Sequence, residues 1–376
     1  ALNYYSVKTF ARSNNFISVL KFLVPLLVVI TLFTFFKPEN LHTQGIAPFG
    51  MSGVEAAISA GGIIFAYLGL TPIISVASEV QHPQRTIPVA LILSVVLSTI
   101  IYVLLQLAFL GSIPTEMLSG GWAEVSKQFS LPYRDIAITL GIGWLSFMVI
   151  SDAIISPSGT GNIYMNATPR VIYGWAKAGT FFKAFTHIDK ESGIPRPALW
   201  LTFGLSIFWT LPFPSWEQLI SVVSAALVLS YAIAPVTAAG LRRNAPDLPR
   251  PFRVRAFAII GPVSFMISAL IVYWSGWTTL AWLLGLQIVM FVVYILCKGK
   301  VPVHTVSLAQ QVKSSLWLIV FYALIMLFSW LGSFGGTNEI AHPWDTVLVA
   351  VMSLGIYYWG ARSCLPQANF SGDEEE

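Results

Sequence analysis

The sequence predicts an all-α, polytopic membrane protein with about ten transmembrane helices. Of its 376 residues, 56% are hydrophobic and only 10% are charged, whereas about a quarter of the residues of a soluble domain carry charge. Long apolar runs recur between short polar segments, and a helix needs about 20 such residues to cross the hydrocarbon core of a bilayer. The chain has too few charged residues to cover a water-facing surface, so we expect it to lie in lipid.

Ten apolar segments account for the predicted spans in chain order. The second is interrupted by glycines and a proline, the fourth is rich in small residues, and the fifth is short, whereas the others are nearly continuous apolar runs. The ten segments are residues 16–36, 56–80, 88–110, 141–165, 198–211, 219–241, 256–274, 278–296, 316–334 and 346–361.

The basic residues predict the orientation of these spans. Ten crossings place 18 of the 21 lysines and arginines on one side, and leave only Lys37, Lys127 and Arg134 on the other. Basic residues concentrate in cytoplasmic loops, so we expect a cell-membrane protein with both ends of the chain in the cytoplasm. The basic residues are dispersed between apolar runs rather than gathered in one patch, so nucleic acid is not an expected partner.

Nothing in the sequence predicts a metal or a cofactor. The two cysteines, Cys297 and Cys364, lie far apart, and the five histidines fall in separate polar loops without the spacing of a metal site. No histidine lies inside a predicted span to act as a general base. An enzyme is therefore not expected.

The second span contains a break near its middle. Gly61, Gly62 and Gly69 lower helix propensity there, and Pro72 removes a backbone hydrogen bond. Lipid tolerates a broken helix only where protein or a watery cavity satisfies its polar groups, and transporters use such breaks to bind solutes near the midplane. The break is either a solute site or an ordinary proline kink.

Three motifs resemble segments of the amino acid–polyamine–organocation superfamily of permeases. Residues 168–179 resemble the segment after the eighth helix of that family, and residues 193–199 resemble the entry to its ninth helix. The loop after the second span is similar to the one that follows the family's sixth helix, with its acidic, proline, basic, aliphatic and proline positions at Glu79, Pro83, Arg85, Ile87 and Pro88.

This resemblance implies part of the inverted-repeat fold of amino-acid transporters. It implies a chain that lacks the first four helices of the family, with residues 1–255 as part of the transporter core (family helices five to ten). Residues 256–376 would be peripheral C-terminal helices (eleven to fourteen) with an acidic tail. The implied function is secondary active transport of an amino acid by alternating access, coupled to a proton or to sodium. The implied substrate site lies in the broken span, at Phe65, Ala66, Tyr67, Leu68 and Gly69, with the Phe65 ring closing over the substrate.

Lys21 lies inside the first predicted span. The resemblance implies a coupling role, because proton-coupled members carry a lysine in this region whose ammonium takes the place of sodium. Burial disfavours the charged form of a lysine, which would allow proton exchange near neutral pH. The alternative is a lysine that reaches the cytoplasmic surface along its own apolar stem.

Asp152, Ser156 and Thr160 recur every four residues in the fourth span. This spacing places them on one helix face, where a carboxylate and two hydroxyls can bind a cation or carry a proton. The alternative is a hydrogen bond between helices, and Pro157 with its neighbouring glycines can also break the helix and the face. Glu55 is expected at the outer start of the second span, where the helix dipole stabilises a carboxylate.

Several functions remain open at this level. A proton-coupled amino-acid permease agrees best with the motifs, and the run from Ser156 to Gly161 faintly resembles a branch that transports aspartate or glutamate. A carrier of polyamines or other organic cations would need acidic residues near the midplane, and only Asp152 qualifies. A membrane scaffold that transports nothing is a further alternative, which the broken helix disfavours.

Overall fold

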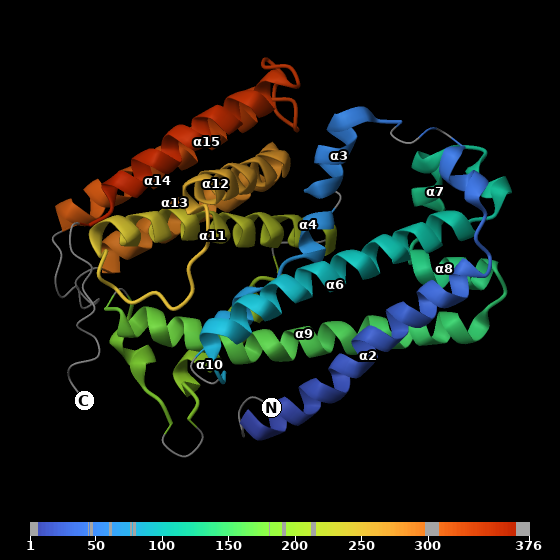
Figure 1. Cartoon of the computed structure of the whole chain (residues 1–376), viewed down its shortest axis with the longest axis horizontal. Coiled ribbons are helices and arrows are strands. Elements are labelled where there is room, and N and C mark those ends of the chain that lie inside the picture. Colours follow the sequence, from blue (N-terminus) through green and yellow to red (C-terminus); the bar gives the residue numbers. More distant parts are fainter. Residues whose placement is uncertain are drawn as a thin grey trace. The chain divides into compact units, whose positions relative to one another are not determined.

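The computed structural model of the chain describes residues 7–43, 45, 48–59, 62–75, 77, 80–179, 181–189, 193–211, 216–297 and 308–365. Within these ranges every regular element is a helix (Figure 1). Gly61, Glu79 and the predicted acidic tail lie outside the described residues, so those expectations have no structural counterpart.

The helices divide into two compact units. The first unit comprises Ala1–Gly50, Leu70–Ile172 and His187–Phe203, and the second comprises Met51–Gly69, Tyr173–Thr186 and Gly204–Glu376. This division into compact units differs from the predicted boundary at residue 255. That boundary separates a transport core from peripheral helices, and it stays a prediction.

The first unit contains most of the first half of the chain. Its elements are α2 (Val7–Phe33), η1 (Pro38–His42), α5 (Thr71–Ser75), α6 (Pro83–Ser112), η3 (Thr115–Leu118), α7 (Trp122–Gln128), α8 (Pro132–Thr139), most of α9 (Gly143–Lys177) and the start of α10 (Arg196–Phe208). Helix α2 packs along α6, and both lead to the end of the unit where α7 and α8 lie (Figure 1).

The core of the first unit lies at this end. Val24, Val28 and Leu32 are spaced four residues apart on one face of α2, and they belong to one buried cluster with residues from the end of α6 and from α7 and α8. Buried Asn40 of η1 binds the end of α6. Its side-chain amide donates hydrogen bonds to three carbonyls between Leu110 and Ile113. Such bonds satisfy carbonyls that have no partner within the helix.

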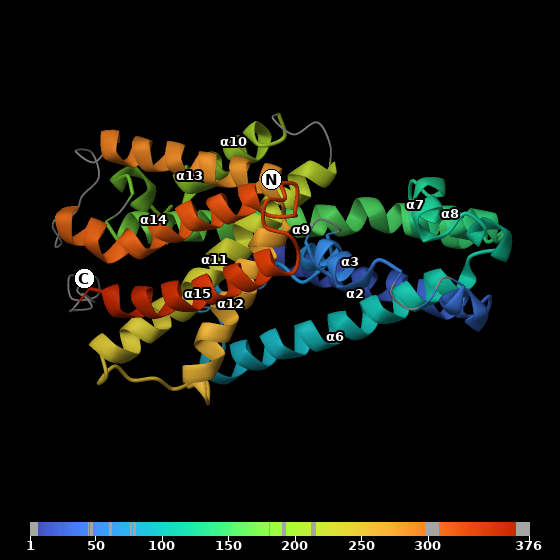
Figure 2. The same cartoon turned by 90° about the horizontal axis from the view of Figure 1, so that it is seen from above.

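The second unit is a bundle of the C-terminal helices together with part of the broken span. Its elements are α3 (Gly50–Ile58), α4 (Ile63–Ala66), η4 (Lys183–Thr186), α11 (Trp216–Asn244), α12 (Phe257–Trp274), α13 (Trp277–Cys297), α14 (Leu308–Leu331) and α15 (Trp344–Ser363), with the ends of α9 and α10. Helices α11 to α15 lie side by side in both views (Figures 1 and 2), in agreement with their contacts.

Close approach of these helices depends on small residues. A Cβ atom added to Gly360 of α15 would lie 2.8 Å from Trp317 of α14 and 2.8 Å from Val236 of α11. Around this point Phe265, Phe321 and Tyr357 are buried in a cluster of aromatic rings. Glycine is therefore required where the three helices meet.

The predicted spans correspond to helices, although not all pass a strict test for crossing a membrane. Within the described ranges, five helices are long and apolar enough to span a bilayer, or six if the two parts of the broken second span count as one. The five are α6, Leu219–Asn244 of α11, α12, Trp277–Leu296 of α13 and Ala309–Leu331 of α14. The other predicted spans fall on α2, α9, α10 and α15, which are shorter or less apolar. The fold is that of an all-helical, multi-pass membrane protein.

Candidate functional site

Lys21 of α2 meets the side chain of Thr160 of α9 inside the first unit. The Lys21 Nζ atom donates a hydrogen bond of 2.8 Å to Thr160 Oγ1. The same hydroxyl donates to the carbonyl of Ser156, one turn earlier in α9, at 3.2 Å. The ammonium therefore contacts the polar face of α9 that the sequence predicts, across 139 positions of the chain.

That polar face is intact because α9 continues through Pro157. The helix runs without a break from Gly143 to Lys177 with Pro157 inside it, so Asp152, Ser156 and Thr160 keep their spacing of four residues on one side. The possibility that proline and glycine interrupt the helix here is wrong. Eight residues advance about 12 Å along a helix axis, which separates Asp152 from Thr160 by two turns.

Asp152 lies partly buried on the same face of α9, two turns before Thr160. Its Oδ1 atom is shielded from solvent and has no hydrogen-bond partner, and Lys21 attracts the carboxylate electrostatically. An ammonium, a hydroxyl and a carboxylate on two facing helices can accept, hold and release a proton or a small cation.

A glycine allows α2 to approach α9 at this point. A Cβ atom added to Gly159 would lie 2.5 Å from Ile17 Cγ2 and 3.4 Å from Lys21 Cε. Any larger side chain would therefore separate the two helices next to the Lys21–Thr160 bond.

The predicted break in the second span is confirmed. Helix α4 ends at Ala66, and the backbone of Tyr67 leaves the helical conformation, with φ −101° and ψ 0°. Gly69 has φ +103°, in the left-handed region that favours glycine, and the next helix, α5, begins at Thr71. The predicted site residues Phe65 to Gly69 thus comprise the end of a short helical turn and the non-helical backbone that follows it.

One side of this segment packs against the rest of the second unit. Ile64 and Leu68, four residues apart, pack against the buried core of the second unit. Phe65 and Tyr67 are half-buried, and Ala66 and Gly69 are exposed. The predicted coupling residues Lys21, Asp152, Ser156 and Thr160 belong to the first unit, whereas the predicted substrate residues Phe65 to Gly69 belong to the second unit.

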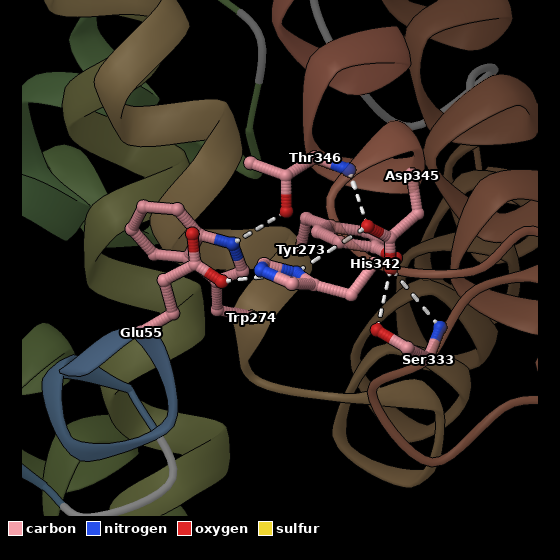
Figure 3. A network of polar contacts seen from close by, with 7 residues as sticks. All are labelled: Glu55, Tyr273, Trp274, Ser333, His342, Asp345 and Thr346. Atoms are coloured by element: carbon pink, nitrogen blue, oxygen red, sulfur yellow. Dashed lines mark hydrogen bonds and ion pairs between the residues drawn. The ribbon is translucent and has the colours of Figure 1, made fainter. Parts of the chain in front are cut away.

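One buried polar network was missed by sequence reasoning. Glu55 is the sixth residue of α3, beyond its first turn, and only 4% of its surface is exposed. The expectation that Glu55 begins a helix at the surface is wrong, because α3 already begins at Gly50. Figure 3 shows the Glu55 carboxylate directed toward His342, with Asp345 on the other side of the imidazole. The polar pair Glu55 and Ser59 in an apolar segment was the available signal, but its partners lie more than 200 residues away.

Comparison with known proteins identifies the family. The sequence profile of the family described as "Amino acid permease" matches residues 1–328. The chain belongs to the amino acid permease family. This permease is 56% identical over 374 residues to the aspartate-proton symporter of Bacillus subtilis, a match that covers 99% of this chain and 72% of that protein.

Two further relatives place the chain among amino-acid transporters. It is 34% identical over 366 residues to a glutamate/serine transporter of B. subtilis, covering 96% of this permease and 67% of the relative. It is 27% identical over 243 residues to the human cationic amino acid transporter 4, covering 63% of this permease and 36% of the relative. These relatives are transporters rather than enzymes, in agreement with the resemblance found in the motifs.

Proposed function

We propose that the protein that carries this chain is a proton-coupled symporter of acidic amino acids. The observation that carries the proposal is the hydrogen bond of 2.8 Å from the ammonium of Lys21 to Thr160, in a family of amino-acid permeases. Two of the relatives described above, an aspartate-proton symporter and a glutamate/serine transporter, support by their names the substrate class and, in the first case, the coupling ion.

Lys21 acts as the coupling residue in this proposal. Its ammonium attracts Asp152 and bonds to Thr160, whereas a neutral amine loses the attraction to the carboxylate. Loss of one proton thus weakens the contact between α2 and α9, which is a local change that two helices can transmit as a relative movement. Ser156 and Thr160 line the face along which the proton or cation is held.

The substrate binds, in this proposal, to the backbone of the broken span. Phe65, Ala66, Tyr67, Leu68 and Gly69 lie where the helix is interrupted, and irregular backbone of this kind can contact a charged solute directly. In this proposal the half-buried ring of Phe65 covers the bound molecule.

The membrane orientation is part of the same proposal. The protein resides in the cell membrane with both ends of this chain in the cytoplasm, as the distribution of basic residues predicts. The contact of Lys37 Nζ with Thr115 Oγ1, at 3.3 Å, supports it, because it joins two segments assigned to the outer side.

Uptake by cells that express the protein tests the proposal. Labelled aspartate, glutamate, leucine, arginine and spermidine are supplied at about pH 5.5 and about pH 8. The lower external pH gives the larger inward proton gradient. We expect uptake of aspartate and glutamate that is faster at the lower pH, and loss of this pH dependence in Lys21→Ala. Uptake insensitive both to pH and to Lys21→Ala would reject proton coupling, and preferred uptake of arginine or spermidine would reject the substrate class.

Two matched controls separate the coupling contact from general effects. Lys127→Ala removes an exposed lysine whose ion-pair partner among the described residues is Glu124 on its own helix, and it should leave uptake unchanged. Thr160→Val and Thr99→Val each remove a hydroxyl that bonds to a carbonyl four residues earlier. Only Thr160 also accepts from Lys21, so only Thr160→Val should alter the pH dependence.

A further inference from the structure

Two polar side chains, Glu55 within α3 and Ser59 directly after its last residue, are turned toward the protein. Glu55 and Ser59 are 4% and 3% exposed, whereas Met51 and Val54 are 63% and 46% exposed. Residues four apart share a helix face, so both polar residues lie on the inner side. Burying a charged side chain is costly unless a partner compensates it, so specific polar contacts must hold α3 in place.

Ser59 provides a contact that does not depend on pH. Its hydroxyl lies 3.0 Å from the carbonyl oxygen of Ile271 and 2.6 Å from the Ser275 hydroxyl, both at the end of α12. None of these groups ionises between about pH 5 and 8. This contact therefore anchors the end of α3 to the bundle under all ordinary conditions.

Glu55, one turn earlier, makes a contact that does depend on a proton. Its Oε2 atom lies 3.5 Å from His342 Nδ1, and the same nitrogen lies 3.8 Å from Asp345 Oδ1 (Figure 3). Both Glu55 Oε2 and His342 Nδ1 are shielded from solvent without a hydrogen-bond partner. An imidazole thus stands between two buried carboxylates.

Asp345 is the fixed charge of this arrangement. It is fully buried. Its Oδ2 atom accepts hydrogen bonds from Tyr273 Oη at 2.7 Å, Ser333 N at 3.1 Å and Ser333 Oγ at 2.6 Å, and Oδ1 accepts from Thr346 N at 2.6 Å. Hydrogen bonds to a carboxylate favour its ionised form, so Asp345 remains an anion while Glu55 lacks such support.

The charge balance makes the contact sensitive to a proton. Within the described parts of the chain, the titratable groups at this point are Glu55 of α3, Tyr273 of α12, His342 and Asp345, and the ion-pair partner of Glu55 is His342. With a neutral imidazole, two ionised carboxylates face each other in a low-dielectric site, which is unfavourable. A proton on His342 places a cation between them. In these same parts no group of three or more histidine, cysteine, aspartate or glutamate side chains has the arrangement of a metal site, so we take the proton as the ligand.

We propose that Glu55, His342 and Asp345 form a proton-binding site that docks α3 onto the α12 and α14–α15 end of the bundle. The bound proton holds the outer half of the broken span against these helices, and its loss releases α3 from His342 while Ser59 remains attached. Because α3 leads into α4 and the segment from Phe65 to Gly69, the site controls the freedom of that segment. This proton site is separate from Lys21 and goes beyond the proposed coupling role of that residue.

A distance measurement between α3 and the loop before α15 tests the inference. Spin labels are placed at Met51 and Thr337, both exposed, in the full protein in lipid nanodiscs, with Cys297 and Cys364 replaced by alanine. Distance distributions are recorded without substrate at about pH 5.5 and about pH 8.5, on either side of neutrality. We expect one narrow population at the lower pH and an additional, longer population at the higher pH.

Two variants should shift this response in opposite directions. Glu55→Gln removes one of the facing charges, so the short, narrow population should persist at both pH values. His342→Gln removes the cation, so the longer population should already be present at the lower pH. Glu39→Gln and His42→Gln change an exposed glutamate and an exposed histidine of η1 and should behave as the unmodified protein.

Two results would overturn the inference, and the first needs no variant. An identical distance distribution at both pH values in the otherwise unmodified, labelled protein would show that the contact binds no proton in this range. Equal loosening of α3 by Glu55→Gln and His342→Gln at both pH values would show a purely structural contact. Lys21→Ala should leave the distance response intact, so failure of the proposed symport and failure of this site are distinguishable.

Discussion

Substitution of Gly159 by alanine tests whether the contact between α2 and α9 controls coupling. The added Cβ would lie 2.5 Å from Ile17 Cγ2, whereas carbon atoms pack at about 3.5–4.0 Å. Ile17 is β-branched and its side chain has one preferred rotamer in a helix, so it cannot swing away. Helix α2 must therefore move by about 1 Å, which stretches the 2.8 Å bond from Lys21 to Thr160 to about 3.8 Å, beyond hydrogen-bonding distance.

The expected cost follows from three contributions to the free energy of unfolding. Overpacking costs about 1–3 kcal/mol, and loss of a hydrogen bond to a charged but partly exposed group costs about 1 kcal/mol. Alanine in place of glycine in a helix interior stabilises the folded state by about 1 kcal/mol. We expect a net destabilisation of about 1–3 kcal/mol, or a fall in the unfolding midpoint of roughly 2–12 °C at about 2–4 °C per kcal/mol.

Gly161→Ala is the matched control on the same helix. A Cβ atom at Gly161 meets nothing within 4 Å, so this change should only add helix propensity and raise the midpoint slightly. Tryptophan fluorescence during thermal unfolding of the purified protein measures both variants, and uptake at two pH values measures coupling. Gly159→Ala should lose pH dependence as Lys21→Ala does. Equal midpoints for the two variants, with normal pH dependence in both, would refute the reasoning.

Three further predictions concern other parts of the molecule. Gly360→Ala should lower the free energy of unfolding by about 1–3 kcal/mol relative to Gly355→Ala, because a Cβ at Gly360 meets two neighbouring helices and one at Gly355 meets nothing within 4 Å; equal thermal midpoints would contradict this packing. Asn40→Ala should cost about 1–3 kcal/mol, since it deprives the carbonyls at the end of α6 of their donor, and a denaturant titration without any change in midpoint would exclude that role. The backbone N–H of Leu131 holds the pKa of Asp135 below its ordinary value. The stabilising effect of the ionised Asp135 carboxylate is therefore complete above its pKa in the unfolded chain, about 3.9. It is lost as the pH falls through the lowered pKa of the folded protein. Asp135→Asn should accordingly lower the thermal midpoint at pH 7 but match the unmodified protein under strongly acidic conditions, and a constant difference across that range would argue against it.

The sequence by itself determined the features that depend on neighbouring residues. Long apolar runs specify helices for a bilayer, because a helix satisfies its own backbone hydrogen bonds in lipid whichever neighbour it meets. The glycines around Phe65 to Gly69 interrupt the second span because glycine and proline act on their own backbone. The spacing of Asp152, Ser156 and Thr160 places them on one face, since helix periodicity is local.

Only the tertiary structure decided which of these faces meet. Thr160 finds Lys21 across 139 positions, and Glu55 finds His342 and Asp345 through the packing of α3 on the C-terminal helices. The sequence predicted Glu55 at the start of a helix, because an argument from the helix dipole uses only residues of the adjacent turn. Whether a buried carboxylate is compensated depends on distant side chains brought within about 4 Å, and the local pattern of a single chain does not contain that information.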